Sequence, residues 1–143
     1  MRALTITQPW ASLLARGDKR VENRTWAPPE ELVGEQVALH ASREFDQFDR
    51  YLIRRRYGIA IEQADCPLGA VVAVGRLTDV LRESQDPWFM GPYGWVFTDI
   101  TRIDPVPCRG ARRLWTLPPD VLLRVERGLR SNAARKVSES RAI

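Results

Sequence analysis

The sequence predicts an α+β fold in which strands of mixed character form a compact, barrel-like sheet flanked by short helices. Short segments in which apolar and polar residues alternate recur along the chain, beginning at residues 4–7, and such alternation is typical of strands. A nearly continuous run of small apolar residues at 69–75 is typical of a central strand that is covered on both sides. Two other segments, 44–57 and 118–130, repeat their apolar residues at the spacing of an amphipathic helix.

The length and composition are those of one ordinary globular domain. A chain of 143 residues with 44% hydrophobic and 28% charged residues can bury a sizeable core. We expect a single domain over residues 1–130 and a basic, disordered tail over residues 131–143, where there is little to bury. No apolar run is long enough to span a bilayer, and no signal-peptide core follows Met1, so we expect a cytoplasmic protein, without a membrane partner, and favour a monomer.

The first elements are a short strand at 4–7 and a helix that begins at Pro9. Proline needs no amide partner in the first turn of a helix, and Thr7 is placed to cap it. Gly17 can end the helix with a positive φ angle. A tight turn then leads to a strand at 19–26.

The later elements are strands, with one helix in the middle of the chain and one at its end. Alternating or continuous apolar residues predict the strands, and the helical spacing predicts the helices, the first of which ends at Gly58. A turn is expected at 104–107. We expect strands at 36–42, 68–81, 95–103 and 109–117, and helices at 44–57 and 118–130. The apolar residues of the middle helix are Phe45, Phe48, Tyr51 and Leu52.

The chain offers no familiar metal or cofactor site. It has two cysteines, Cys66 and Cys108, which lie far apart in the sequence, and a single histidine, His40. These residues are too few for the usual zinc ligand sets, so no metal and no cofactor is expected. Each cysteine neighbours a proline and is expected to be a buried free thiol.

Positive charge is concentrated in the last third of the chain. Residues 1–103 carry 13 Lys and Arg against 14 Asp and Glu, whereas residues 104–143 carry 9 against 4. Such a bias favours a polyanionic partner such as nucleic acid, although arginine-rich segments also arise from base composition alone. Arg112 and Arg113 are the candidate contacts at the entry of the last strand.

The densest group of chemically active side chains lies between residues 8 and 26. On a strand that starts at Lys19, Glu22 and Arg24 share one face while Lys19 lies on the other. A contact between Lys19 and Glu22 therefore requires Lys19 to lie in the preceding turn or at a bulge. Glu22 and Arg24 either form a structural ion pair or recognise a base, with the carboxylate accepting from an exocyclic amine and the guanidinium donating to a carbonyl or phosphate.

Two further features also have two interpretations each. His40 is either a buried structural histidine at a strand end or a donor that lines the same cavity as Lys19. The arginines at 54–56 either complement the negative end of a helix dipole or contact phosphate.

The loop at 83–94 carries more large apolar groups than a loop needs. Trp88, Phe89 and Tyr93 either pack onto the body of the domain or form a surface on which a flat ligand such as a base stacks. Trp10, from the first helix, is a second candidate for such stacking.

Several motifs resemble those of the ASCH family, small domains of the PUA-like superfamily. The resemblance runs from residue 4 to about residue 117, so it covers most of the domain and excludes the tail. The matching motifs are Gln8-Pro9-Trp10-Ala11, Gly17-x-Lys19-x-x-Glu22-x-Arg24, His40-Ala41-Ser42, Gly94-Trp95, and Pro107 with Leu114-Trp115.

The resemblance implies a β-barrel surrounded by helices, with a cleft lined by Lys19, Glu22 and Arg24. It also implies association with RNA or with modified nucleosides. Some family members resemble amidohydrolases that remove the acetyl group from N4-acetylcytidine, and ribonuclease activity is associated with others. Lys19 matches the lysine of the amidohydrolase members, while Glu22 stands where those members have a threonine.

We therefore carry three functional hypotheses from the sequence. The first is a module that binds RNA or a modified nucleoside, and the second is a hydrolase of an acylated nucleobase or of RNA. The third is a protein-interaction domain that uses Arg112, Arg113 and the terminal helix. The candidate catalytic residues are Lys19 and Glu22. The candidate ligand-binding residues are Gln8, Trp10, Arg24, His40, Ser42, Trp88, Tyr93, Arg112 and Arg113.

Overall fold

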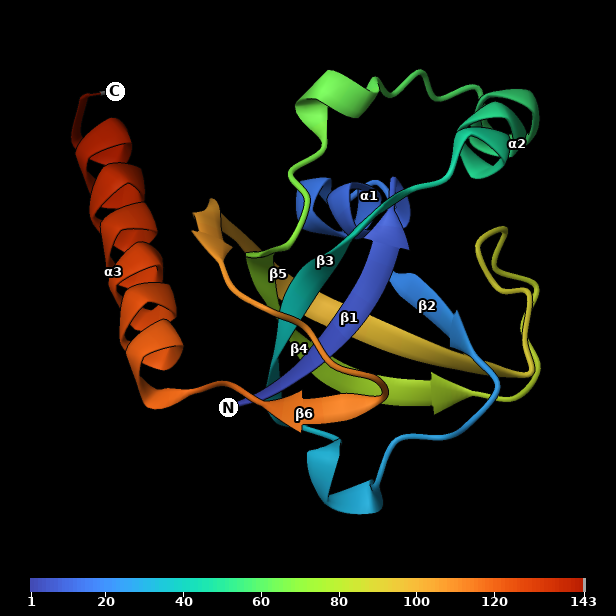
Figure 1. Cartoon of the computed structure of the whole chain (residues 1–143), viewed down its shortest axis with the longest axis horizontal. Coiled ribbons are helices and arrows are strands. Elements are labelled where there is room, and N and C mark those ends of the chain that lie inside the picture. The colour runs from blue at the N-terminus through green and yellow to red at the C-terminus, as the bar shows by residue number, and fades with distance from the viewer. Residues whose placement is uncertain (143) are drawn as a thin grey trace.

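The computed structural model describes residues 1–142 and contains one mixed sheet and three α-helices (Figure 1), so the predicted α+β class is confirmed. The strands are β1 (Arg2–Gln8), β2 (Val21–Arg24), β3 (Gln36–Phe45), β4 (Ala70–Leu81), β5 (Tyr93–Pro107) and β6 (Leu114–Thr116). The helices are α1 (Trp10–Arg16), α2 (Gln47–Tyr57) and α3 (Pro119–Ala142), and there are two short 3₁₀ turns at Glu30–Leu32 and Gln63–Asp65.

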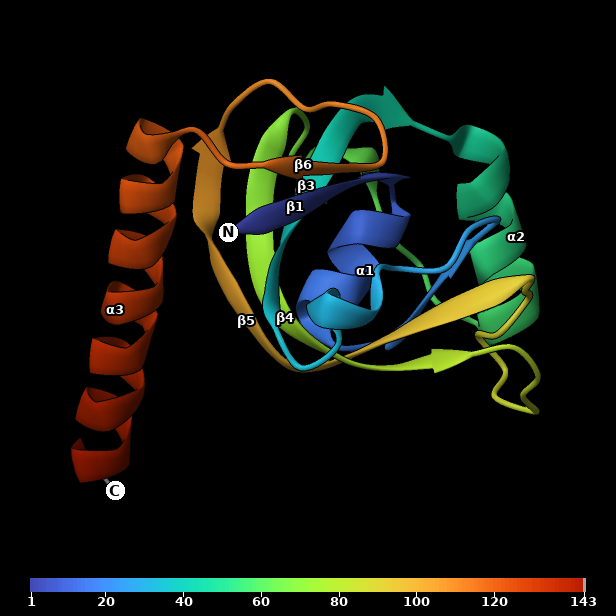
Figure 2. The ribbon, with the colours of Figure 1, turned by 90° about the horizontal axis from the view of Figure 1, so that it is seen from below.

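All six strands belong to one sheet in the order β2-β5-β4-β3-β1-β6. β1 and β3 run parallel, and the other neighbouring pairs are antiparallel. The sheet curves strongly around α1 (Figure 2), and the register shifts between β4 and β5 contribute to this bending. Within residues 1–142, β2 and β6 are the two edges of this order, so the sheet is not closed into the barrel that the sequence predicts.

The two faces of the sheet pack against different helices. The concave face holds α1 and the largest core, which includes Leu4, Leu14 and Trp95. The outer face packs against the first half of α3 through Val121 and Val125. Figures 1 and 2 both show α3 standing beside the sheet, with its second half extending away from the body.

The start of α1 is stabilised by Gln8 instead of Thr7. Gln8 Oε1 accepts a hydrogen bond from the backbone N–H of Ser12 at 2.9 Å, and Gln8 Nε2 donates to the Pro67 carbonyl oxygen at 2.7 Å. The prediction of Thr7 as the cap is wrong, because the longer glutamine side chain folds back over the first turn and satisfies one of its free amides. Gly17 ends the helix with a φ of 84°, as predicted.

The predicted apolar face of α2 points outward. Phe48 and Tyr51 are 65% and 56% exposed, and Ile53 is the buried residue of this helix. Asp49 and Ile53, one helical turn apart, face α1 instead, because Asp49 has a hydrogen-bond partner there and Ile53 an apolar one. The predicted end of the helix at Gly58, which has a φ of 68°, is confirmed.

The last third of the chain has longer elements than the sequence predicts. β5 continues through the expected turn at 104–107, since this end of the strand pairs with β4 alone and prolines are tolerated where one edge is free. α3 continues to Ala142, where we expected a disordered tail from residue 131. Its second half is mostly exposed, so the good helix-forming residues there, with one hydrogen bond from Asn132 Nδ2 to the Arg102 carbonyl oxygen at 2.9 Å, account for the extension.

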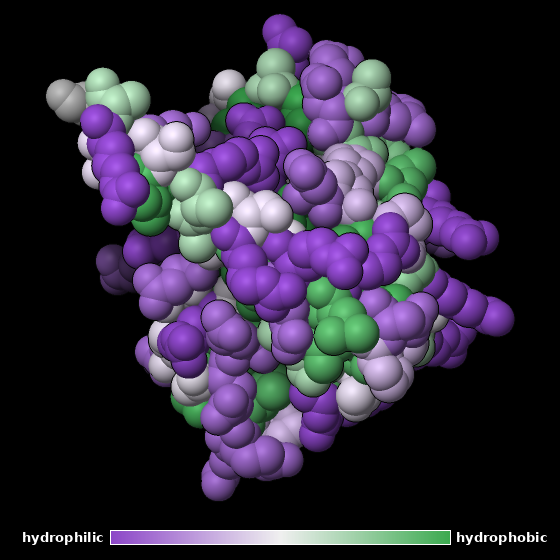
Figure 3. Space-filling view, turned by 90° about the vertical axis from the view of Figure 1, so that its left-hand side faces the viewer, coloured by the Kyte–Doolittle hydropathy of each residue, from purple (hydrophilic) through white to green (hydrophobic). Residues whose placement is uncertain are grey.

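α3 is the longest helix, and its side of the molecule is mostly hydrophilic with scattered apolar patches (Figure 3). None of the helices in residues 1–142 is long and apolar enough to cross a membrane.

Candidate functional site

A cleft of about 560 Å³ opens where β1 and β2 meet α1 and the start of α2. It brings together residues 5–10, 19–26 and 44–49, with Met90 from the loop before β5. Its lining includes both Lys19 and Glu22, the candidate catalytic residues, and Trp10 and Arg24 from the candidate ligand-binding set. The other residues of the lining are Thr5, Ile6, Thr7, Asn23, Thr25, Trp26, Glu44, Asp46, Asp49 and Met90.

Lys19 lies in the turn before β2 and is only 2% exposed. Its backbone N–H donates to the Leu13 carbonyl oxygen at 3.2 Å, so the end of α1 fixes the turn. The ammonium Nζ donates to Glu22 Oε1 at 2.7 Å and lies 4.7 Å from the centre of the Trp10 ring. The condition set by the strand geometry, that Lys19 must sit in the turn to reach Glu22, is met.

Glu22 is held between two cations. Lys19 binds its Oε1, and Arg24 Nη2 donates to its Oε2 at 3.0 Å. Burial alone would raise the pKa of Glu22, but the charges and hydrogen bonds of Lys19 and Arg24 outweigh burial and hold that pKa below its ordinary value. Glu22 is therefore ionised at neutral pH and is a weak base.

Arg24 connects this cluster to the neighbouring strand. Its Nη2 also donates to the Thr5 carbonyl oxygen in β1 at 2.8 Å. Its Nε is buried and has no hydrogen-bond partner among residues 1–142. The side chain as a whole is 21% exposed, so the accessible part of the guanidinium can donate to an acceptor on a ligand.

Two indoles form the apolar walls of the cleft. Trp10 Nε1 donates to Asp49 Oδ2 at 2.8 Å, which fastens the first turn of α2 to α1. Trp26 packs edge-on against the buried Trp95, with ring centres 4.8 Å apart, and the guanidinium of Arg113 lies 4.1 Å from the centre of the Trp26 ring.

The cleft is acidic overall. Its charged lining consists of two cations, Lys19 and Arg24, and four carboxylates, Glu22, Glu44, Asp46 and Asp49. Since both cations are already bound to Glu22, the remaining carboxylates disfavour a phosphate group and favour a ligand that presents N–H donors. The arrangement suits the edge of a neutral base better than a nucleic-acid backbone.

The loop before β5 packs onto the body of the domain. Trp88 stacks on Tyr57 of α2, with ring centres 3.7 Å apart, and Tyr93 lies under the guanidinium of Arg82. Asn23 fixes the loop to β2 by donating to the Trp88 carbonyl oxygen at 2.9 Å and accepting from the backbone of residues 90 and 91. Both aromatic rings pack on the protein and neither lines the cleft, to which this loop contributes Met90.

Gln8 also lies outside the cleft lining. It is fully buried, and its amide oxygen and nitrogen both bind protein groups. The structure gives Gln8 a role in holding α1, and Gln8 is not among the residues that line the cleft.

His40 is a buried structural histidine. Trp115 Nε1 donates to Thr5 Oγ1 at 3.0 Å, and Thr5 Oγ1 lies 3.2 Å from His40 Nδ1. His40 Nε2 lies 2.9 Å from the Cys108 carbonyl oxygen, which can only accept, so this nitrogen carries the proton and Nδ1 accepts from Thr5. Burial lowers the pKa of His40, although the bond to Cys108 acts in the opposite direction.

Three of the predicted residues line a separate, smaller hollow beside the cleft. His40, Ser42 and Arg112 border this space of about 360 Å³, while Arg113 lines neither space and lies over the ring of Trp26. Both cysteines are free, as expected, with Cys66 buried and Cys108 half-buried.

The sequence reasoning missed the carboxylates contributed by the segment around α2. Asp46 caps the helix by accepting from the Asp49 backbone N–H at 3.0 Å, and Glu44 precedes it. An Asp three residues before another Asp at a helix start is a signal for a cap. No sequence pattern indicates that α2 lies beside the cleft. The helix is held there by the hydrogen bond from Trp10 to Asp49, two residues that are far apart in the sequence.

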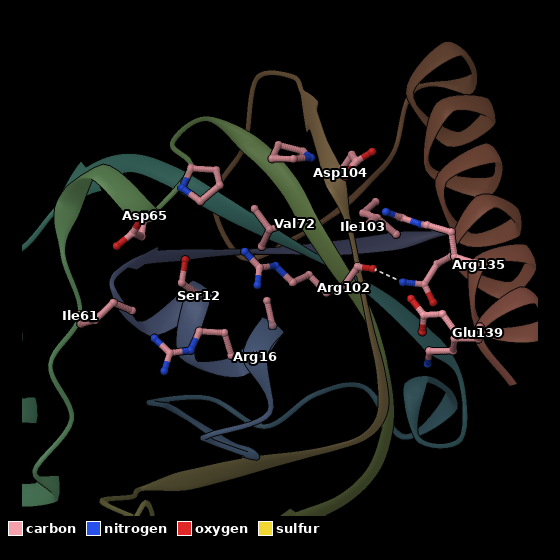
Figure 4. Close-up of a pocket in the computed structure, with 15 residues that line it drawn as sticks. Ser12, Arg16, Ile61, Asp65, Val72, Arg102, Ile103, Asp104, Arg135 and Glu139 are labelled. Carbon is pink, nitrogen blue, oxygen red and sulfur yellow. Dashed lines mark hydrogen bonds between the residues drawn. The ribbon is translucent and has the colours of Figure 1, made fainter. Parts of the chain in front are cut away.

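A larger hollow of about 710 Å³ lies between α1, β5 and the second half of α3 (Figure 4). Its charged residues, including Arg16, Arg102, Arg135 and Glu139, are exposed side chains of both signs. Figure 4 shows them spread over the walls of the hollow, with no buried charged group among them. This hollow therefore lacks the fixed polar geometry of the cleft.

We predict that Glu22→Gln lowers the free energy of unfolding by about 3 kcal/mol at pH 7, because it leaves the buried Lys19 without its counterion. The lowered pKa of Glu22 adds stability that is present above the ordinary value of 4.5 and is lost as the pH falls through the lowered value. The difference between the two proteins therefore shrinks below about pH 4. Urea denaturation at several pH values measures it, and Glu83→Gln, in an exposed loop, is the control.

His40 is the only histidine of the chain, so its titration can be followed alone. Because its pKa is lowered from the ordinary value of 6.5, the unfolded chain takes up a proton first as the pH falls. We predict that stability decreases from pH 7 to pH 5 and that the imidazole Hε1 resonance titrates with a midpoint below 6.5. A midpoint at or above 6.5 would contradict the buried neutral assignment.

The sequence and the structure were compared with known proteins, and both comparisons found ASCH domains. The family model described as ASCH domain matches residues 4–91, a span that includes Lys19, Glu22 and Arg24. No curated protein matches the sequence.

Among solved structures, the chain is similar to ASCH from Zymomonas mobilis, with a TM-score of 0.52 and 13% identity over 87% of this chain and 92% of that chain. A serine-to-alanine variant of the Zymomonas protein gives a TM-score of 0.55 and 14% identity over the same shares. A tyrosine-to-phenylalanine variant gives 0.52 and 13% over 87% and 94%. These likenesses support the same fold, while the family match covers more than half of the sequence. The chain therefore belongs to the ASCH domain family.

Proposed function

We propose that this protein binds RNA by receiving one nucleoside, including a modified one, in the cleft lined by Lys19, Glu22 and Arg24. The observation that carries this proposal is the cluster of these three charges between two indole walls, in which Lys19 and Glu22 are buried and Arg24 is half-buried. Such a cluster costs free energy to bury, and it faces a space of about 560 Å³, which lies in the range of small-molecule sites.

The chemistry of the lining fits the edge of a cytosine-like base. The carboxylates of Glu22 and Asp49 can accept from an exocyclic amine, and the partly exposed guanidinium of Arg24 can donate to a ring carbonyl. Trp10 and Trp26 supply apolar contact to the ring. The net negative charge of the lining favours the base over the phosphate as the group that enters.

Two other observations support RNA as the source of the nucleoside. The last third of the chain is basic, which favours a polyanion, and the members of this family are thought to bind RNA. Phosphate contacts fix the position of a nucleic acid on a protein, while contacts to base edges select among bases. The lining of the cleft is suited to contacts with a base edge.

The two tryptophans that differ in placement give a matched test. We expect Trp26→Ala to weaken binding of a nucleoside about 10-fold or more, because removing an aromatic ring that stacks on a base costs about 1 to 3 kcal/mol per base. Trp88→Ala, which removes a tryptophan packed on Tyr57, should change the affinity less than about 2-fold.

Calorimetric titration with the four standard ribonucleosides and N4-acetylcytidine measures these affinities, with circular dichroism as the check on folding. Equal weakening in both variants, or no binding of any of the five by the wild type, would remove the cleft as a nucleoside site.

A hydrolase is the second candidate function, and the 2.7 Å pair of Lys19 and Glu22 at the cleft is the observation that favours it. Paired with a carboxylate, the ammonium is suited to stabilise the oxyanion that develops on an acyl carbonyl or a phosphodiester when water attacks. Glu22 is held as a weak base by its two cations, so it positions Lys19 more readily than it takes a proton. This arrangement resembles an amidohydrolase site in its lysine and departs from it at Glu22.

The two lysines of the chain provide the test of this candidate. If the cleft is catalytic, Lys19→Ala should lower the kcat/KM for N4-acetylcytidine, or for cleavage of labelled RNA, about 100-fold or more. Lys136→Ala, on the exposed part of α3, should leave both rates unchanged. No turnover of either substrate by the wild type, or turnover that survives Lys19→Ala, would exclude this role.

A further inference from the structure

The small hollow beside the cleft has the opposite charge. We call it the basic hollow and define it by Arg43, Arg109 and Arg112 on its rim and by Thr5, His40 and Ser42 within it. Among residues 1–142, no carboxylate lines it, and its volume of about 360 Å³ is large enough for a phosphate group with part of a ribose.

The three arginines of the basic hollow have no charged or hydrogen-bonded side-chain partner in the part of the chain that the structure describes. None of them forms an ion pair or a side-chain hydrogen bond with any of residues 1–142. By contrast, the two cations of the cleft, Lys19 and Arg24, are bound to a carboxylate. Three guanidinium groups around one space with no counterion attract an anion.

Close packing holds the walls of the basic hollow in place. A Cβ atom at Gly110 would lie 2.6 Å from His40 Cε1, so this glycine lets the loop between β5 and β6 press against the ring. That contact positions the neighbouring Arg109 and Arg112. A Cβ at Gly69 would lie 3.3 Å from Arg43 Cγ, so the third arginine also lies close against the backbone.

The basic hollow and the cleft are neighbours. Thr5 lines both of them, and its carbonyl oxygen is the acceptor for Arg24 of the cleft. The loop between β5 and β6 also connects the two, because Arg112 lines the basic hollow while the guanidinium of Arg113 lies over the ring of Trp26, a residue of the cleft lining. A nucleotide is a neutral base joined to a charged phosphate, and the two spaces offer this pair of environments side by side.

We propose that the basic hollow binds a backbone phosphate of the RNA whose base occupies the cleft. This inference rests on the proposed function, since it takes the base in the cleft as given. Arginine suits the ligand because its planar fork can donate two parallel hydrogen bonds to phosphate oxygens. The neutral His40 floor adds no charge of its own, so the arginines supply the attraction.

The test compares two double variants that remove the same charge. Arg43→Gln with Arg112→Gln removes two arginines of the basic hollow, and Arg127→Gln with Arg130→Gln removes two exposed arginines of α3. Fluorescence anisotropy with a labelled 12-nucleotide RNA at several salt concentrations gives the affinity and its salt dependence. Calorimetry with free nucleosides reports on the cleft alone.

We expect the variant of the basic hollow to bind the RNA about 10-fold more weakly at low salt than the α3 variant does. The slope of log affinity against log salt should become shallower by about 0.7 for each phosphate that the protein no longer neutralises. Nucleoside affinity should stay within about 2-fold of wild type in both variants.

Each contrary outcome has a separate meaning. If both double variants bind RNA alike, the basic hollow is not a phosphate site, even where nucleosides still bind the cleft. If RNA binding depends on the basic hollow but not on Trp26, the phosphate site is supported and the nucleoside cleft is not. Equal binding of a polyglutamate peptide, with the same dependence on Arg43 and Arg112, would overturn the assignment to RNA in favour of an acidic protein partner.

Discussion

The contact between the Lys19 ammonium and the Glu22 carboxylate is the interaction on which the cleft depends. It joins the turn after α1 to β2, and Arg24 extends it to β1 through the Thr5 carbonyl oxygen. Lys19 and Glu22 are buried, so removing one of these two leaves the other less compensated in a medium that solvates it poorly. The Trp10 ring then closes the space over Lys19, and its bond to Asp49 brings α2 to the rim.

Short-range features of this arrangement could be predicted from the sequence. The end of α1 at Gly17 follows from its position after a helical pattern, and the placement of Lys19 in the turn follows from strand geometry once a contact with Glu22 is assumed. The α+β class and the order of elements are also visible in the apolar spacing. The cap by Gln8 could not be predicted from the sequence. The orientation of its amide depends on a hydrogen bond to the Pro67 carbonyl oxygen, which lies in a distant segment.

Long-range placement is what the sequence could not supply. The spacing of Phe48, Tyr51 and Leu52 indicates an apolar face, but which face of α2 turns inward is decided by what Asp49 and Ile53 meet on α1. Barrel closure likewise depends on whether the two edge strands reach each other, and local alternation contains no information on that. The contacts of Trp88 and His40 could not be predicted either. The sequence does not distinguish an aromatic or imidazole side chain that packs inside the protein from one that binds a ligand.

The charge of the cleft comes from the segment around α2 and not from the buried cluster. Lys19, Arg24 and Glu22 together carry one positive charge, and Glu44, Asp46 and Asp49 make the lining negative. Under the proposed function, such a cleft selects the donors of a base edge but repels the backbone that carries the base. The attraction for the backbone must then come from a surface whose cations have no internal partner. The arginines beside Thr5 meet that condition, and they lie next to the cleft through a residue that both spaces share.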